Sequence, residues 1–316
     1  MAHAPPEPGD VIAAREVIRP DIRVTPILTN QPLNDVLGFE AFFKCEHLQA
    51  TGSFKLRGAS YAVAGLPDDC AGVATHSSGN HGAALACAAR QRGLAAHVVV
   101  PDNAVRVKIE NIRDHGGEVH LCRPDQAARE AGLAKFIEQG FAAIPPYDDN
   151  RIIAGQGSCA LELMEQVENL DIIVTPVGGG GLLAGSALAA LAQHRAPRVI
   201  GVEPAGADDT IRSLARGSRV TDHNPETIAD GLRALVGERN LAIIRTAVEQ
   251  VIAVDEADII AAMRLIWTHT RQLVEPSGAV ALAGIMTHRQ DFAGARVGMV
   301  ISGGNLDIEP VLATLQ

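Results

Sequence analysis

The chain is poor in lysine and in aromatic residues, and it lacks both a basic cluster and a long apolar run. Aromatic residues make up 3% of its 316 residues, charged residues make up 20%, and the formal net charge is −10. Nucleic-acid binding is disfavoured, because phosphate contacts need massed lysine and arginine. The most apolar helical run, Gly181–Ala192, is well below the ~20 residues needed to cross a bilayer. We therefore expect a soluble protein that binds a small molecule.

The cysteines form no pattern that predicts disulfides or a metal site. The five cysteines are Cys45, Cys70, Cys87, Cys122 and Cys159. They include no CxxC pair, and an odd number would leave one unpaired, so reduced thiols are expected. Met1–Asp10 has neither the basic nor the apolar region of a secretory signal and is interpreted as a short flexible arm. These features predict a cytoplasmic protein.

From Val73 onward, short apolar runs alternate with longer segments of helical period, which predicts parallel sheets covered by helices, an α/β fold. The expected strands are Ala41–Lys44, Gly72–His76, Ala96–Val100, Glu118–Cys122, Phe141–Ile144, Ile172–Val177, Val199–Val202, Val251–Val254 and Val297–Ile301. The expected helices lie near Asn80–Gln91, Val105–Asp114, Gln126–Gln139, Gly155–Val167, Leu182–His194, Asp255–Leu273 and Ser277–Arg289.

The length suits two domains at the usual ~150 residues each. Glycine and proline signals at Gly65, Pro145 and Pro146 bracket a compact stretch with four expected strands. Residues 65–147 are therefore predicted to form a small inserted domain, and residues 1–64 with 148–316 to form the large domain.

Amine chemistry has few candidates, because the only lysines are Lys44, Lys55, Lys108 and Lys135. Lys55 lies in TGSFKLRG, residues 51–58, a glycine-flanked and mostly uncharged turn before an apolar helical segment. Burial lowers the pKa of an amine, and the neutral amine is the form that condenses with a carbonyl. A lysine in a loop is more often a solvated surface residue, so Lys55 needs support from other segments.

Two further segments are typical of anion-binding turns. THSSGNHG, residues 75–82, and GGGG, residues 178–181, each follow an expected strand and precede an expected helix. Backbone N–H groups at a helix N-terminus suit a carboxylate or a phosphate, and glycines allow close approach. The first turn is equally consistent with an ordinary helix cap, for which serine and asparagine are also preferred.

The glycine-rich segment also fits a dinucleotide fingerprint, which would indicate an NAD-dependent oxidoreductase. Gly179-x-Gly181-x-x-Ala184 matches G-x-G-x-x-A, and Glu203 ends the next strand as a ribose-binding acid would. This interpretation leaves the Lys55 turn, the 75–82 turn and the terminal SGGN of residues 302–305 without a role. Pyridoxal phosphate (PLP) would use all four, because its aldehyde, phosphate, ring nitrogen and 3-hydroxyl each need a partner.

These four segments, in this order, resemble the fold-type II PLP enzymes, and most closely the serine racemase and serine/threonine dehydratase group. The resemblance spans nearly the whole chain and includes Ile153–Gly157, Glu203–Asp209, Glu226–Gly231 and Glu275–Gly278. It implies a tryptophan synthase β-like fold with two doubly wound, open twisted sheets, one in each domain. It also implies a homodimer with an amino-acid substrate.

The resemblance assigns roles to cofactor-binding residues by position. Lys55 would carry the cofactor and act as the base for the α-proton, with Phe54 packed beside the ring, and Asn80 would bind the 3-hydroxyl. The phosphate would be held by Gly178, Gly179, Gly180, Gly181 and the N–H of Leu182. Ser302 would meet the pyridine nitrogen. A neutral serine does not keep that nitrogen protonated, which favours elimination.

The resemblance also implies a substrate site and a metal site. Ser77, Ser78, Asn80 and His81 would bind the substrate α-carboxylate, and Ser78 would face Lys55 across the ring, as the second acid of a racemase. Glu203, Ala207 and Asp209 match the divalent-cation site of serine racemases. Oxygen-only ligation favours Mg²⁺ or Ca²⁺.

Arg129 falls where serine racemases and 3-hydroxyaspartate dehydratases place an arginine able to bind a second substrate carboxylate. Alternatively, Arg129 forms a surface pair with Asp125, four residues earlier on the same helix. Ala234, preceded by Arg233, departs from the serine that serine racemases carry there. The resulting hypothesis is a dehydratase (ammonia-lyase) of serine, threonine or 3-hydroxyaspartate.

The alternatives are an amino-acid racemase on the same scaffold, an NAD-dependent oxidoreductase and a catalytically silent PLP-binding protein. Lys55, Ser78 and Ser302 together argue against the silent protein, because each serves a step beyond binding. The remaining histidines, His97 and His120 among them, show no metal spacing along the sequence and are interpreted as structural or surface residues.

Overall fold

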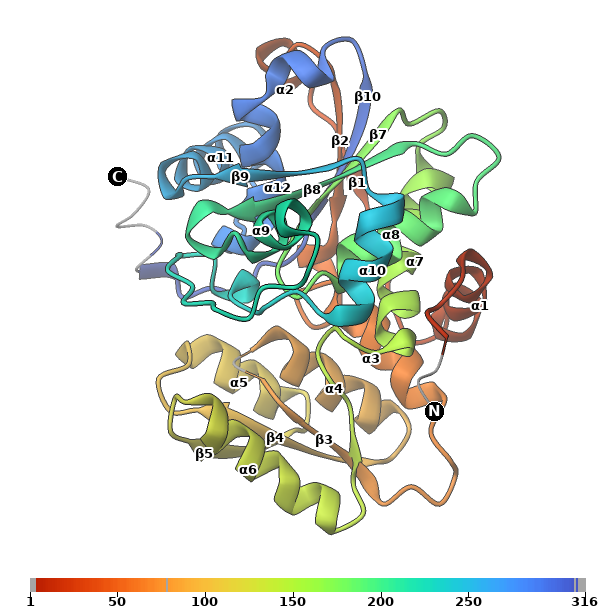
Figure 1. Ribbon diagram of the computed structural model, residues 1–316, viewed down its shortest axis with the longest axis vertical. Coiled ribbons are helices and arrows are strands. Elements are labelled where there is room, and N and C mark those ends of the chain that lie inside the picture. The colour runs from red at the N-terminus through yellow and green to blue at the C-terminus, as the bar shows by residue number, and fades with distance from the viewer. Residues whose placement is uncertain (1–3, 78, 310, 312–316) are drawn as a thin grey trace.

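The computed structural model describes residues 4–77, 79–309 and 311 and contains two separate β-sheets (Figure 1). The large sheet has the order β1-β2-β10-β7-β8-β9 and is parallel apart from β1. Its strands are β1 Ile27–Leu28, β2 Glu40–Cys45, β7 Ile172–Pro176, β8 Arg198–Pro204, β9 Gln250–Val254 and β10 Arg296–Ile301. The α/β fold with two sheets is as the sequence predicts.

The small sheet has the order β5-β4-β3-β6 and is parallel throughout. Its strands are β3 Gly72–His76, β4 Ala95–Pro101, β5 Glu118–Cys122 and β6 Ala142–Ala143. All four strands fall inside the predicted insert, residues 65–147. The domain boundaries themselves stay a prediction.

Helices cover both faces of each sheet. The α-helices are α1 Pro8–Ile18, α2 Gln31–Leu37, α3 Lys55–Ala64, α4 Asn80–Gln91, α5 Arg106–Asp114, α6 Gln126–Glu138, α7 Asn150–Gln166, α8 Gly181–Leu191, α9 Asp209–Arg216, α10 Glu238–Ala247, α11 Glu256–Thr270 and α12 Pro276–Thr287. Short 3₁₀ helices are η1 Glu46–Leu48, η2 Ala205–Ala207, η3 Asp230–Leu232 and η4 Arg289–Phe292. Within the described part of the chain, no helix is both long and apolar enough to cross a membrane.

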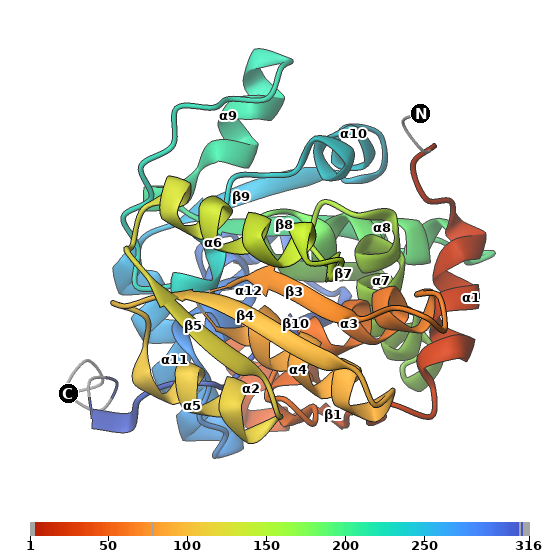
Figure 2. The same ribbon diagram turned by 90° about the horizontal axis from the view of Figure 1, so that it is seen from below.

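Alternate residues of a large-sheet strand point to opposite faces of the sheet and pack in two different hydrophobic cores. Ile172 and Val174 of β7 pack in one core with α2, α11 and α12, whereas Ile173 packs in a second core with α1, α7, α8 and α10. In the small sheet, α6 lies on one face and α4 and α5 on the other (Figure 2). Burial on both faces explains why these parallel strands read as continuous apolar runs.

Some local predictions are wrong. The arm predicted at Met1–Asp10 turns helical at Pro8, where α1 starts with proline in its first turn and a capping box between Glu7 and Asp10. Helix α7 starts before the predicted Gly155 because the Asp149 side chain accepts a hydrogen bond from the Arg151 N–H and caps it.

The prediction for the cysteines agrees with the structure, because all five are free thiols.

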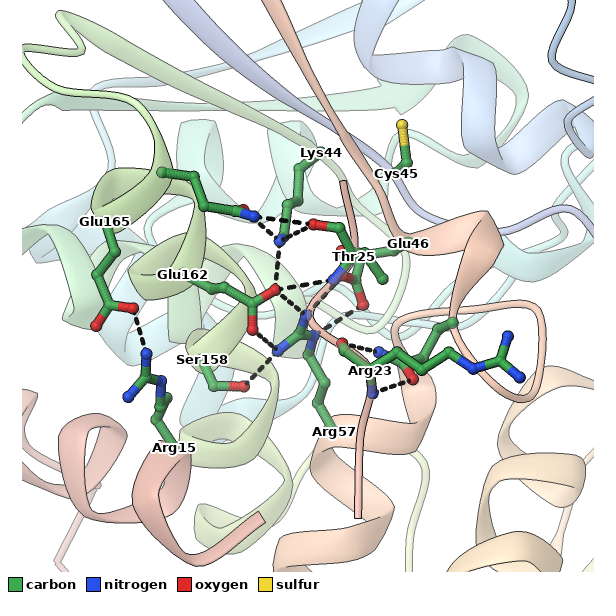
Figure 3. A network of polar contacts seen from close by, with 12 residues as sticks. Arg15, Arg23, Thr25, Lys44, Cys45, Glu46, Arg57, Ser158, Glu162 and Glu165 are labelled. Atoms are coloured by element: carbon green, nitrogen blue, oxygen red, sulfur yellow. Dashed lines mark hydrogen bonds and ion pairs between the residues drawn. The ribbon is translucent and has the colours of Figure 1, made fainter. Parts of the chain in front are cut away.

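A buried ion network fixes helix α3, which starts at Lys55 (Figure 3). Arg57 donates to Glu46 at 2.7 and 2.8 Å and to Glu162 at 3.0 and 3.2 Å. Lys44 also pairs with Glu162, and all four side chains are at most 3% exposed. Burial alone would raise the pKa of Glu46, but the Arg57 guanidinium lowers it. The network therefore ties α3 to β2, η1 and α7.

Candidate active site

A cavity of about 570 Å³ lies where the carboxyl ends of strands from both sheets meet. Segments that follow β3, β7 and β10 line it, as do the start of α3 and one face of α6. The structure brings the following predicted site residues together in its wall: Phe54, Lys55, Ser77, Asn80, His81, Arg129, Gly178, Gly179, Gly180, Gly181, Leu182 and Ser302. Ser78 lies outside the described residues.

Lys55 is the first residue of α3, and its Nζ donates to the Pro146 carbonyl oxygen at 2.9 Å. The ammonium also lies 5.1 Å from the centre of the Phe54 ring. Burial lowers the pKa of Lys55 to about 8, because desolvation disfavours the charged form. Roughly a tenth of this amine is therefore neutral and nucleophilic at pH 7, far more than of a solvated lysine with a pKa near 10.4.

The glycine-rich loop joins β7 to α8 in a conformation that only glycine takes easily. Gly180 has φ +86° and precedes the first turn of α8. A Cβ atom at Gly179 would lie 2.3 Å from Tyr147 Cγ, and one at Gly178 would lie 2.9 Å from Leu232 Cα. The first N–H groups of α8 have no partner within the helix, so the loop and Leu182 present donors suited to a phosphate.

Polar side chains stand beside this loop. Ser302 Oγ donates to the Ser277 carbonyl oxygen at 3.2 Å, and the same O–H can rotate to donate to an acceptor in the cavity. Asn80 Nδ2 donates to Glu275 Oε1 at 2.7 Å, while Asn80 Oδ1 accepts from Asn305 at 2.9 Å. The second hydrogen of Asn80 Nδ2 is left for a ligand oxygen.

Ser77 caps helix α4 from outside it. Its Oγ accepts hydrogen bonds from the N–H groups of Gly79 at 3.2 Å and Gly82 at 3.1 Å. Both lone pairs of the hydroxyl are then used, so its O–H remains as a donor toward the cavity. From the sequence, this turn could be an ordinary helix cap or an anion-binding site. Ser77 can serve as both, because its oxygen caps the helix while its O–H faces the cavity.

The His81 side chain is committed to the protein interior. Its Nε2 lies 3.0 Å from the Ile144 carbonyl oxygen, to which it donates. Burial, and then the charge of Lys55, lower the pKa of His81 to about 3, so the ring is neutral. The backbone N–H in the first turn of α4, and not the imidazole, is the donor that His81 offers to a carboxylate.

Arg129 on α6 faces the cavity. Its Nε is buried and has no hydrogen-bond partner among the residues that the structure describes. Asp125, the alternative partner, caps the Ala128 N–H at 2.7 Å and lies 3.5 Å from Arg123, and no Asp125–Arg129 ion pair occurs among the described residues. A guanidinium with an unsatisfied buried N–H suits a ligand carboxylate.

Sequence reasoning missed a buried ionic cluster in the cavity wall. Lys108 of α5 donates to Asp230 at 2.7 and 2.8 Å and lies 2.9 Å from Glu275 Oε2. Burial would lower the pKa of Lys108, but the two carboxylates raise it. Burial raises the pKa of Glu275 despite this neighbouring ammonium. The scarcity of lysine was the one available signal, because Lys108 is one of only four lysines in the sequence.

Arginines and a tyrosine complete the wall. Arg219 and Arg233 donate to the carbonyl oxygens of Val236 and Thr227, which holds their guanidinium groups in place. The Tyr147 ring lies against Gly179, and burial raises its pKa. Together with Arg129, these arginines give the cavity an excess of positive charge, since Asp230 and Glu275 offset Lys108.

The predicted metal-site residues lie outside the cavity wall. Glu203 accepts from the N–H groups of Thr210 and Ile211 at 3.3 and 2.8 Å, and Asp209 accepts from Val236 at 2.7 Å. Burial raises the pKa of Glu203 to about 8 and also raises that of Asp209. Because Glu203 points at α9 and not at the glycine loop, it is not placed as a ribose-binding acid.

The residues present fit PLP. The glycine loop and the α8 N-terminus suit its phosphate, Ser302 and Asn80 offer hydroxyl and amide groups to its ring, and burial lowers the pKa of the Lys55 amine to about 8. Likewise, Glu203 and Asp209 are buried carboxylates, and carboxylate and carbonyl oxygens are the ligand atoms that Mg²⁺ and Ca²⁺ prefer.

Comparisons with known proteins agree with this geometry. The family model described as "Pyridoxal-phosphate dependent enzyme" matches residues 18–303. The chain is 45% identical over 303 residues to the β-hydroxyaspartate dehydratase of Paracoccus denitrificans (95% of this chain, 96% of that protein). It is also 45% identical over 311 residues to the serine racemase of Dictyostelium discoideum (96% and 95%). The structure of maize serine racemase superposes with a TM-score of 0.94 at 38% identity (99% and 97%).

Proposed function

This chain belongs to the pyridoxal-phosphate-dependent enzymes, and we propose that it is a dehydratase that converts 3-hydroxyaspartate to a 2-oxo acid and ammonia. The observation that carries the choice of substrate is the buried, unpartnered Nε of Arg129 in the cavity wall. Serine and threonine have one carboxylate, whereas 3-hydroxyaspartate has two. The similarity to a β-hydroxyaspartate dehydratase supports the same choice.

The α-carboxylate of the substrate binds at the start of α4. The Ser77 O–H and the first backbone N–H groups of α4 are donors suited to it, and the positive end of the helix dipole adds to their attraction. Arg129, on the neighbouring helix α6, binds the second carboxylate. Two anion sites at a fixed separation then hold the reacting carbon and its β-hydroxyl in one orientation.

PLP, when bound, supplies an electron-withdrawing ring that makes the α-hydrogen of an amino acid acidic. Lys55 would hold the cofactor through its Nζ, and the same amine would take the α-proton of the substrate. The low pKa of Lys55 suits both steps, because the amine must be neutral to act as a nucleophile or as a base. Ser302 would present a neutral hydroxyl, and not a carboxylate, to the ring nitrogen.

The metal site has a supporting role in this proposal. Glu203, Asp209 and the Ala207 carbonyl hold Mg²⁺ or Ca²⁺, which offsets the repulsion of two buried carboxylates. Asp209 also accepts the Val236 N–H, and Val236 lies just after the cavity residues Arg233–Leu235. The ion therefore stabilises one cavity wall without touching the substrate.

The decisive experiment measures ammonia and 2-oxo acid from the four 3-hydroxyaspartate isomers, L- and D-serine and L-threonine. One variant is Arg129→Ala, and its matched control is Arg123→Ala, whose side chain is 81% exposed near the same helix. A lost charged hydrogen bond is worth about 1.5–3 kcal/mol. We expect kcat/KM for the preferred hydroxyaspartate to fall roughly 10- to 100-fold in Arg129→Ala, with serine turnover and the control unchanged.

Two results would contradict the proposal. If the wild type prefers serine or threonine, the proposed dicarboxylate substrate is wrong, but the proposed dehydratase reaction stands. Inversion of chirality without release of ammonia would replace the dehydratase by a racemase. The homodimer and the cytoplasmic location stay predictions, which sedimentation analysis and cell fractionation test.

A further inference from the structure

Three side chains with metal-binding atoms converge on the edge strand β5 of the small sheet and its neighbour β4. His97 lies on β4, and Glu118 and His120 lie on β5. Because His97 pairs with Glu118 in the parallel register, and alternate residues of a strand share a face, all three side chains point to the same side. The cluster was invisible in the sequence, since its ligands come from neighbouring strands and have no helical or CxxC-type spacing.

The distances within the cluster match a coordination shell. His97 Nδ1 lies 3.1 Å from His120 Nε2. One Glu118 oxygen lies 3.4 Å from His97 Nδ1, and the other lies 3.4 Å from His120 Nε2. Zinc bound tetrahedrally at about 2.0–2.1 Å places neighbouring ligand atoms about 3.3 Å apart. An ion can therefore enter between these three side chains with little movement of the strands.

Aromatic rings hold both imidazoles in place. Phe136 of α6 stacks on His97 with ring centres 4.5 Å apart, and its ring centre lies 4.7 Å from that of His120. Phe141 meets His97 edge-on at 4.6 Å. The His97 side chain is 14% exposed, whereas Glu118 is 65% exposed, so the cluster is anchored at one end and open to solvent at the other.

We propose that His97, Glu118 and His120 form a binding site for a divalent transition-metal ion of the zinc class, with water in the fourth position. Two imidazoles and one carboxylate are a ligand set that zinc uses when it keeps an open coordination site. Imidazole ligands disfavour Mg²⁺ and Ca²⁺, so this site is chemically distinct from the oxygen site at Glu203. A metal here joins the edge strand β5 to β4.

Helix α6 connects this site to the cavity, because it contacts the histidine cluster and also carries Arg129. Phe136 contacts both histidine rings, and Arg129 lies seven residues earlier on the same helix, about two turns away. Metal binding thus stabilises the layer that carries Arg129. Its expected effect is on thermal stability, because an ion that binds only the folded state raises the unfolding midpoint.

The test uses PLP-loaded enzyme freed of metal by a chelator and then titrated with Co²⁺ in excess Mg²⁺, which occupies the oxygen site. Tetrahedral Co²⁺ gives intense visible absorption bands. We expect one equivalent of Co²⁺ per chain with such bands, displacement by Zn²⁺, and a higher unfolding midpoint with Zn²⁺.

Glu118→Gln and His120→Ala should each weaken Co²⁺ binding by at least about tenfold, since even outer partners of metal ligands contribute that much. Glu118→Gln is the safer variant for folding, because the side chain is largely exposed. His194→Ala, an exposed histidine on the large-sheet layer, is the matched control and should bind as the wild type does. Absence of tetrahedral bands, or equal Co²⁺ affinity in the wild type and both cluster variants, would overturn the site.

Discussion

Lys108 Nζ lies 2.9 Å from Glu275 Oε2, and this contact joins helix α5 beside the small sheet to the start of α12 beside the large sheet. Glu275 also accepts a hydrogen bond from Asn80, a residue of the cavity wall. The lysine therefore holds the carboxylate that in turn orients Asn80. One ion pair links the packing of two layers to the geometry of the candidate active site.

The first prediction concerns stability. Lys108→Met leaves Asp230 and the buried Glu275 without their cation, and breaking a buried pair in this way costs about 3–5 kcal/mol. Urea unfolding should show that loss in the unfolding free energy. Lys135→Met, at an exposed position on α6, is the control and should change it by less than about 0.5 kcal/mol. Equal stability of the two variants would mean that the carboxylates relax into solvent.

The second prediction concerns the attachment of PLP. Reduction of the loaded enzyme with borohydride should fix the cofactor to the peptide that contains Lys55, because Lys55 is the cavity lysine with no carboxylate contact among the described residues. Peptide mass spectrometry reads the modified position. Modification of Lys108 in its place would reject the assignment, and Lys55→Ala should abolish activity while Lys135→Ala preserves it.

The third prediction concerns pH. The pKa of Lys55 is lowered from 10.5 to about 8, so its neutral fraction rises between about pH 7 and 9 and not near pH 10.5. The rate at which PLP combines with cofactor-free enzyme should increase with pH and reach half its maximum near pH 8. Stopped-flow absorbance measures this rate. A midpoint near pH 10 would show that the amine is solvated.

The fourth prediction concerns the glycine loop. In Gly179→Ala the new methyl group would lie 2.3 Å from Tyr147 Cγ, so the ring or the loop must move, and both line the cavity. We expect PLP affinity to fall at least about tenfold, or about 1.4 kcal/mol, as measured by titration of cofactor-free enzyme. Gly9→Ala, with no heavy atom within 4 Å of the new Cβ, is the control. In a Tyr147→Ala background the same substitution should cost less.

The sequence predicts the fold well where local and global signals agree. The helix Asn80–Gln91 has the predicted bounds because a glycine-containing turn precedes it and the helix itself is rich in alanine. By contrast, β1 has only two residues, and α2 and α9 have seven and eight, which is too short for a periodic pattern. Local signals are present, since the Asn30 side chain caps α2 and Gly38 ends it, but helices this short show no repeating apolar face in the sequence.

The candidate site shows the same contrast between features visible in a continuous segment and features that depend on tertiary contacts. The Lys55 turn and the glycine loop are continuous segments whose chemistry is visible in the sequence. Lys108 and Asp230 are 122 residues apart, and their contact depends on how the two layers meet. The cluster of His97, Glu118 and His120 depends on the register of β4 against β5, which no sequence pattern specified.

The position of β10 has a consequence for synthesis of the chain. This strand lies between β2 and β7, so the large sheet cannot be completed until residues near 300 have left the ribosome. The roughly 250 residues that separate β2 from β10 require roughly 10 to 50 seconds at ~5–20 residues per second. The small sheet, within residues 72–143, can close much earlier. During that interval β2 presents an unpaired edge, and the nascent chain is most prone to aggregate there.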